Sequence, residues 1–271
     1  MNIFEANVAG KQMNGNLLLQ DISISVKQGE RIAIIGHNGS GKSSLLKLIG
    51  GIFEQSSGEI KRANIKTAYV PEHFPENICF KMQEYLLLMG KMSGSQGDEL
   101  SKQITAYAKS FEIEEFLHTP LKNCSKGTKQ KAGIIQALLM DPELLLLDEP
   151  LTGLDEQAQL ELLNQLESKR GNNTIIFTVH ESMLIDRLAD RVLMIKNGRI
   201  VDDSVMTKKE KIMVIKAVIS NQIQVSGLPC ISFEWIEENI IEMMVLAEES
   251  NKLLKKLLEQ DFLILELREK R

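Results

Sequence analysis

A glycine-rich stretch near the N-terminus has the residue types and spacing of a phosphate-binding loop. It fits the pattern G-x-x-x-x-G-K-[ST] and reads Gly36-His37-Asn38-Gly39-Ser40-Gly41-Lys42-Ser43. Glycines let backbone N–H groups turn inward onto phosphate oxygens without a Cβ clash. Lys42 would supply positive charge to the β- and γ-phosphates, the Ser43 hydroxyl suits Mg²⁺, and Ser44 would hold the α-phosphate. These residues predict a site for a nucleoside triphosphate.

Two adjacent carboxylates follow an apolar run further along the chain. Asp148 and Glu149 come directly after Leu144–Leu147, which has the composition of a buried strand. Asp148 suits the Mg²⁺ shell of a phosphate-loop enzyme. Glu149 would point the other way and polarise an attacking water as a general base. Together with the glycine-rich loop, the pair predicts hydrolysis of the bound nucleotide.

Alternating strands and helices would bring these residues together. Arg31–Ile35 is a nearly continuous apolar run that ends at Gly36, and helical spacing follows it. Residues 174–179 form another apolar run, which ends at His180. The alternation predicts an α/β fold with a largely parallel sheet and right-handed crossovers. Because such sheets bind ligands at the carboxyl ends of their strands, we expect Gly36, Asp148 and His180 to converge on one crevice.

Several further elements surround this predicted sheet. We expect a half-buried strand at residues 21–26, a mostly helical region from about 80 to 140, and a hairpin turn at Asn197-Gly198. Residues 156–169 predict an amphipathic helix. Its inward-facing residues would be Leu160, Leu163 and Leu166.

The C-terminal part of the chain has a different pattern. Residues 205–210 are polar and basic and predict a linker, which would separate a domain at residues 1–204 from a small α+β domain at residues 211–271. Strand and helix patterns succeed one another in the smaller part without residues suited to chemistry. We expect a module for packing or for dimer contacts there.

The composition excludes several classes of protein. The 271 residues include 43% hydrophobic and 25% charged residues, with a net charge of −5, as in ordinary globular proteins. Because nucleic-acid binders need a cationic footprint, we expect no nucleic acid partner. No apolar run approaches the roughly 20 residues that cross a bilayer, and three widely spaced cysteines indicate a reducing compartment. We therefore expect a cytoplasmic protein.

The order of these motifs resembles that of the ATP-binding-cassette (ABC) ATPases over about residues 3–203. Cys124-Ser125-Lys126-Gly127-Thr128 stands where the family has its signature, usually Leu-Ser-Gly-Gly-Gln; Ser125 and Gly127 are retained, whereas Lys126 and Thr128 are replacements. The resemblance implies a P-loop NTPase fold with an inserted helical subdomain. It also implies that these four residues face the γ-phosphate of ATP on a second subunit, in a head-to-tail sandwich.

The same resemblance assigns further positions. Asp155 would belong to the D-loop, which crosses the dimer interface, and His180 would contact the γ-phosphate. Glu72 replaces the family's Q-loop glutamine and would face the metal side. The family's base-stacking aromatic is missing, and Met13 would cover adenine instead. Base selectivity between ATP and GTP is left open.

The resemblance implies the ATP-hydrolysing subunit of a bacterial ABC transporter, with ATP and Mg²⁺ as cofactors. It would act as a homodimer or as a heterodimer with a paralogue, at the inner face of the membrane, on a separate transmembrane permease. Export is favoured by the Ser-Lys-Gly and Pro-Glu variants, which resemble drug, peptide and antibiotic exporter ATPases. One alternative is a soluble ABC-type ATPase without a transport partner. A catalytically inactive nucleotide-binding regulator is disfavoured, because Lys42, Asp148, Glu149 and His180 are present.

Overall fold

The computed structural model describes residues 1–95, 97–169, 171, 173–179, 182–206, 212–218 and 228–270. It contains two compact units, Met1–Met206 and Thr207–Arg271. Within the described ranges, every helix is too short or too polar to traverse a bilayer.

A six-stranded sheet forms the centre of the first unit. Its strands are β3 (Arg31–Ile35), β5 (Thr67–Val70), β6 (Leu144–Leu147), β7 (Thr174–Thr178), β8 (Arg191–Lys196) and β9 (Arg199–Val205). They lie in the order β5-β6-β7-β3-β8-β9, and all neighbours are parallel except β8 and β9. The central strands are nearly all apolar because both faces of the sheet are covered. This arrangement confirms the predicted α/β fold with a mixed, mainly parallel sheet.

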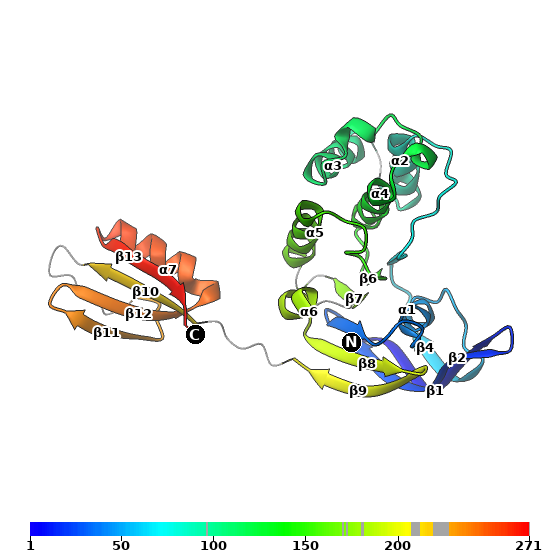
Figure 1. Cartoon of the computed structure of the whole chain (residues 1–271), viewed down its shortest axis with the longest axis horizontal. Helices are drawn as coiled ribbons and strands as arrows, with labels where there is room; N and C mark the ends of the chain where they lie inside the picture. Colours follow the sequence, from blue (N-terminus) through cyan, green and yellow to red (C-terminus); the bar gives the residue numbers. More distant parts are fainter. Residues whose placement is uncertain are drawn as a thin grey trace. The chain divides into compact units, whose positions relative to one another are not determined.

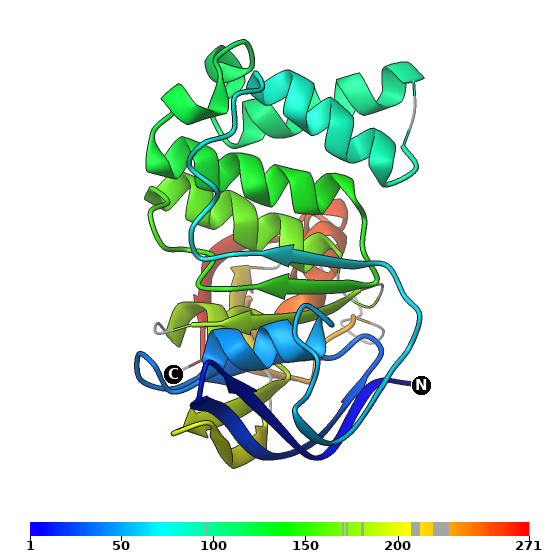
Figure 2. The same ribbon diagram turned by 90° about the vertical axis from the view of Figure 1, so that its right-hand side faces the viewer.

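One face of this sheet is covered by a helix and a second sheet. The helix is α1 (Lys42–Ile49), and the antiparallel sheet, in the order β2-β1-β4, is formed by β1 (Asn2–Met13), β2 (Asn16–Lys27) and β4 (Ser57–Arg62). Figures 1 and 2 show α1 lying between the two sheets. Leu45, Leu46 and Leu48 of α1 are fully buried there. The predicted strand at residues 21–26 is part of β2.

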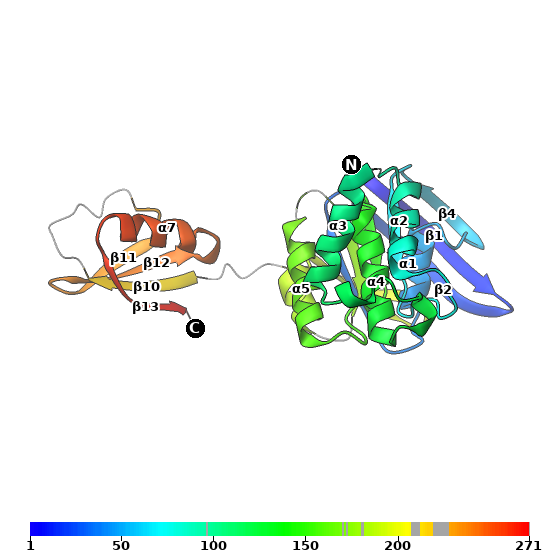
Figure 3. The same ribbon diagram turned by 90° about the horizontal axis from the view of Figure 1, so that it is seen from above.

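Helices cover the opposite face. They are α2 (Met82–Met92), α3 (Gly97–Ser110), α4 (Lys126–Leu139), α5 (Glu156–Ser168) and α6 (Ser182–Leu188), with the short 3-10 helices η1 (Glu114–Phe116) and η2 (Leu121–Asn123). Figure 3 shows α2, α3 and α4 beside one another, and their apolar side chains share one core with the sheet. The expected helical region therefore contains three helices that pack together.

The structure corrects the predicted inward face of α5. Leu163 and Leu166 are buried as expected, but Leu160 is 46% exposed. Ala158 and Leu162 are buried in its place. At 3.6 residues per turn, residues 158, 162 and 166 lie on one side of the helix, and position 160 lies nearly opposite residue 162.

The hairpin turn was predicted correctly. β8 and β9 pair antiparallel on either side of Asn197 and Gly198, which both have positive φ, 50° and 74°. That conformation is typical of a type I′ turn, which favours Asn-Gly.

The second unit is an antiparallel sheet with one helix packed against it. Its strands β10 (Ile212–Val218), β11 (Ser232–Glu237), β12 (Ile240–Leu246) and β13 (Leu263–Glu269) lie in the order β11-β12-β10-β13, and α7 (Ala247–Glu259) covers them. Leu253 and Leu257 of α7 are buried against Ile215, Ile241 and Met243 of the sheet. Most of the predicted linker, residues 207–210, lies outside the described residues.

Candidate nucleotide-binding site

The glycine-rich loop joins β3 to α1 at the carboxyl end of the central strand. Gly36 and Gly41 have φ angles of 155° and 112°. A Cβ on Gly36 would lie 2.3 Å from the carbonyl oxygen of Ile195, so a side chain there cannot be accommodated without moving backbone. The loop leads directly into the start of α1, and a helix N-terminus favours anions.

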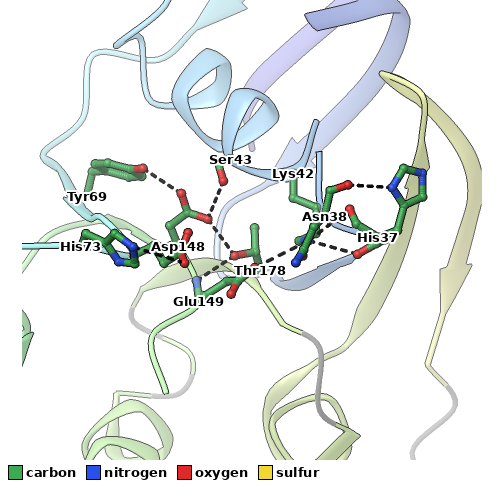
Figure 4. A network of polar contacts seen from close by, with 11 residues as sticks. His37, Asn38, Lys42, Ser43, Tyr69, His73, Asp148, Glu149 and Thr178 are labelled. Atoms are coloured by element: carbon green, nitrogen blue, oxygen red, sulfur yellow. Dashed lines mark hydrogen bonds and ion pairs between the residues drawn. The ribbon is translucent and has the colours of Figure 1, made fainter. Parts of the chain in front are cut away.

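Lys42 begins α1 and turns its side chain back toward the loop. Its Nζ donates to the carbonyl oxygens of Gly36 at 3.0 Å and His37 at 3.4 Å, and lies 3.6 Å from Oε1 of Glu149. His37 itself contacts Asn38, through Nδ1 and the carbonyl oxygen at 2.8 Å. Figure 4 shows the ammonium group between the loop and the end of β6. The positive charge predicted for the phosphates is therefore present and only 5% exposed.

The buried Asp148 carboxylate accepts hydrogen bonds from three hydroxyl groups. Ser43 Oγ and Thr178 Oγ1 donate to Oδ1 at 3.0 and 2.9 Å, and the Tyr69 hydroxyl donates to Oδ2 at 2.9 Å (Figure 4). Burial, reinforced by the negative charge of Asp148, raises the pKa of Tyr69 above its usual value, so the phenol stays protonated. The three donors come from α1, β7 and β5. The carboxylate orientation is thus set by three separate elements.

Glu149 follows with an unusual backbone conformation. Its φ is 47°, in the left-handed region, which costs a residue other than glycine about 1–2 kcal/mol. Its backbone N–H donates to Thr178 Oγ1 at 2.7 Å, so this hydroxyl links the Glu149 backbone to the Asp148 side chain. The Glu149 side chain contacts Lys42 and lines the cavity described next.

A cavity of about 530 Å³ lies over the loop. Ligand pockets are typically about 300–1,000 Å³. The lining residues are Leu17, Leu18, Asn38, Gly39, Gly41, Lys42, Ser43, Ser44, Glu72, Glu149, Asn197 and Gly198. The structure thus brings together most of the predicted loop with Glu149 and Glu72. Within the loop, Ser40 Oγ is buried and has no hydrogen-bond partner in the described part of the chain.

The residues present fit Mg²⁺. This ion prefers oxygen ligands, keeps several waters and usually takes only one or two protein groups beside substrate phosphates. The Ser43 hydroxyl and the Asp148 carboxylate are 3.0 Å apart. Across the described ranges there is no cluster of three or more His, Cys, Asp or Glu that would form an all-protein metal site. A two-residue oxygen site beside a phosphate cavity matches what Mg²⁺ requires.

The signature residues lie at the N-terminus of α4, and none of residues 125–128 lines the cavity of this same chain. Ser125 is the N-cap: its Oγ accepts from the Thr128 backbone N–H at 3.1 Å and lies 2.7 Å from Thr128 Oγ1. Ser125 and Lys126 are exposed, whereas Thr128 is buried. The predicted contact with nucleotide therefore concerns a second subunit and stays a prediction.

The loop that contains Asp155 contacts α4 through an ion pair and a close backbone approach. Asp155 caps α5 through the Ala158 backbone N–H at 2.9 Å and forms an ion pair with Lys131 of α4 at 2.7 Å. The hydrogen bond from Lys131 is the main reason why the pKa of Asp155 is lowered. In addition, a Cβ on Gly127 would lie 2.7 Å from the Gly153 carbonyl oxygen. The signature and this loop are thus in direct contact within one chain.

Two features of the site could not have been predicted from the motifs. Tyr69 and Thr178 hold Asp148, but a tyrosine or threonine in a strand carries no signal of such a role. The hydrophobic wall of the cavity is formed by Leu17 and Leu18 rather than by Met13, which is 46% exposed. His180 lies outside the described residues.

Comparison with known proteins supports one family. The family model for ABC transporters matches residues 19–152. An ABC transporter ATP-binding protein of Methanocaldococcus jannaschii is 33% identical over 193 residues, which cover 70% of this chain and 73% of the relative. The ABC transporter ATP-binding protein NatA of Bacillus subtilis is 30% identical over 198 residues, which cover 68% of this chain and 80% of NatA.

Solved structures agree with this result. The structure of an ATP-binding subunit of an ABC transporter matches with a TM-score of 0.69 and 27% identity, over 75% of this chain and 90% of the other. A dimeric ATP-binding cassette bound to ADP and Pi shares the fold, with a TM-score of 0.68 and 22% identity, over 74% of this chain and 98% of the other. The relatives, the fold and the loop with its carboxylates agree that the chain belongs to the ATP-binding proteins of ABC transporters and is a P-loop ATPase.

Proposed function

We propose that this chain is the subunit that binds MgATP and hydrolyses it to drive an ABC transporter. The observation that carries the proposal is the cavity of about 530 Å³ in which Lys42, Ser43 and Glu149 meet beside the buried Asp148. ATP phosphates would lie on the N–H groups of the loop and the start of α1. Ser43 and Asp148 would hold Mg²⁺, which neutralises phosphate charge when bound. Glu72 lines the same cavity and would face the metal side.

Lys42 and Glu149 would change partners when nucleotide binds. Lys42 donates to two loop carbonyls and contacts the Glu149 carboxylate. Phosphate oxygens are stronger partners for Lys42 than the neutral loop carbonyls, because that hydrogen bond is charge-assisted on both sides. When Lys42 turns to them, Glu149 loses this contact and can accept a proton from the attacking water as general base.

The site would be completed by a second cassette. The exposed Ser125 and Lys126 lie at a helix N-terminus, which favours anions. We propose that the second cassette is another copy of this chain, with a paralogue as the alternative, and that residues 125–128 of each copy face the γ-phosphate held by the other. His180 would contact the same phosphate.

Coupling to transport would need a membrane subunit, on which this chain would sit at the cytoplasmic face. Relatives that are ATP-binding proteins of zinc import in Halorhodospira halophila and of molybdate/tungstate import in Pyrococcus abyssi support a transport role. We propose export from the Ser-Lys-Gly and Pro-Glu variants. Uptake of candidate substrate into inverted vesicles that contain the permease would support export, and MgATP-driven loss from them would contradict it.

Lys42→Ala tests the proposed function. Phosphate release and ATP binding should both fall sharply, because the charge facing the phosphates is removed. The matched control is Lys47→Ala, on the same helix, where the ammonium lies 5.6 Å from the Phe53 ring centroid and does not line the cavity. Normal ATPase activity in Lys42→Ala, or equal loss in both variants, would refute the assignment of the loop.

A further inference from the structure

Tyr69 holds Asp148 although it belongs to none of the motifs. It lies on β5, the strand that leads to Glu72. The Tyr69 hydroxyl donates to Oδ2 of Asp148 at 2.9 Å, whereas Ser43 and Thr178 both donate to Oδ1. Figure 4 shows Tyr69 and Thr178 on either side of the carboxylate. Tyr69 is thus the one donor to Oδ2 among the described residues.

The position of Tyr69 is itself well fixed. It pairs with Leu146 in the parallel ladder of β5 and β6, and the Asp148 backbone N–H continues this ladder by donating to Val70 at 2.9 Å. The next residue, Pro71, accepts a hydrogen bond at 3.1 Å from Nε2 of Gln130, a buried residue of α4. A phenol carried on such an anchored segment can orient a carboxylate, since positioning groups act best from rigid elements.

An aspartate carboxylate can rotate over a wide range unless its neighbours hold it. The terminal torsion of an aspartate side chain is only weakly restricted by the chain itself. Two donors on Oδ1 alone would fix only one end of the carboxylate and leave it some rotation about the Cβ–Cγ bond. A donor on Oδ2 removes this freedom and leaves Oδ1, next to the Ser43 hydroxyl, directed to where the ion would bind.

We infer that Tyr69 is a positioning residue for the Mg²⁺ site, which orients Asp148 through its hydrogen bond to Oδ2. This inference rests on the proposed function, in which Asp148 and Ser43 hold the ion. Tyr69 acts through Asp148 and does not contact the reacting atoms. Groups that orient metal ligands in this way typically contribute about 10–100-fold to metal affinity.

The test is the effect of Mg²⁺ on nucleotide binding, which needs no turnover. The dissociation constant of AMPPNP, a non-hydrolysable ATP analogue, is measured by calorimetry with excess Mg²⁺ and with EDTA. The value in EDTA divided by the value with Mg²⁺ is the ratio that gives the gain in affinity due to the ion. Tyr69→Phe should lower this ratio about tenfold. The dissociation constant in EDTA should stay within about twofold of wild type, because Tyr69 does not line the cavity.

Tyr85→Phe is the matched control. Tyr85 is also partly buried and donates its hydroxyl to a side chain, Gln136 Oε1, within the helical region. This control should leave the Mg²⁺ ratio unchanged. A wild-type ratio in Tyr69→Phe, or an equal loss in Tyr85→Phe, would overturn the inference, and melting temperatures of both variants confirm that they are folded.

Asp148→Asn separates the two levels of the proposal. If Asp148→Asn loses the Mg²⁺ effect and Tyr69→Phe keeps it, the inference about Tyr69 is wrong and the metal site stands. If Asp148→Asn also keeps the full effect, the proposed metal site itself is wrong. Loss in both variants, with Tyr85→Phe unaffected, supports both.

Discussion

The contact between Gly127 and Gly153 gives a quantitative prediction for Gly127→Ala. A Cβ on Gly127 would lie 2.7 Å from the Gly153 carbonyl oxygen. This is a backbone atom, so it cannot rotate away as a side chain would. Either the start of α4 or the loop that contains Asp155 must therefore move by several tenths of an ångström or more, because ordinary contacts begin near 3.4 Å.

The cost to stability should be small because two effects oppose each other. Alanine in place of glycine stabilises a helix by about 1 kcal/mol, whereas overpacking a close contact costs about 1–3 kcal/mol. The net loss should then be at most about 2 kcal/mol, and the protein should remain folded. Catalysis should suffer more: a displacement of about 1 Å in a positioned site can cost about a hundredfold in rate.

The assay is phosphate release together with ATP binding. Gly127→Ala should lower the ATPase rate at least about tenfold. ATP binding to the single subunit should be unchanged, since Gly127 does not line the cavity. The control is Gly90→Ala in α2, where the three atoms nearest to the new Cβ all belong to the side chain of Leu100 rather than to backbone. Wild-type hydrolysis in Gly127→Ala, or an equal loss of hydrolysis and binding, would show that the contact with Gly153 does not position the signature for catalysis.

Three further variants address the signature and its neighbour. Ser125→Arg should abolish phosphate release but spare ATP binding to the single subunit; loss of both would remove Ser125 from its role in trans. Thr128→Val deletes the hydroxyl 2.7 Å from Ser125 Oγ and should lower turnover severalfold, with rescue by Thr128→Ser; failure of that rescue would show that the methyl group matters instead. Because the pKa of Asp155 is lowered, mainly by Lys131, its stabilising effect should be present above the unfolded carboxyl pKa of about 4 and be lost as the pH falls through the lower, folded value. Denaturation should therefore show wild type more stable than Asp155→Asn near neutral pH, with the difference vanishing in acid; a constant difference would contradict this.

Much of the fold and the centre of the site were accessible from the sequence. Arg31–Ile35 and Leu144–Leu147 are short apolar runs followed by a special residue, and strands of this kind meet at one edge of a parallel sheet. That rule places the glycine-rich loop beside Asp148 without knowledge of register. The Asn197-Gly198 turn could also be predicted from the sequence, because few residue pairs adopt its two positive φ angles.

The supporting contacts were not accessible, because they depend on register and on close approaches between distant segments. Tyr69 reaches Asp148 only because β5 pairs with β6 in one particular register. The approach of Gly127 to Gly153 joins the first turn of α4 to a loop, and no local pattern connects the two. Leu160 was misplaced because leucines spaced by three residues were taken as one face, although the helix turns 3.6 residues at a time.

Two cassettes that close over MgATP should form a stable dimer when hydrolysis is blocked, and sedimentation velocity of Glu149→Gln measures that dimer. This change should slow turnover by about 10²–10⁴, the usual contribution of a general base, while the loop and Lys42 still bind nucleotide. With saturating MgATP, we expect a species of twice the 30.5 kDa of one chain, which dissociates to single chains when EDTA is added. A single chain of 30.5 kDa in saturating MgATP would show that two copies do not close over the nucleotide.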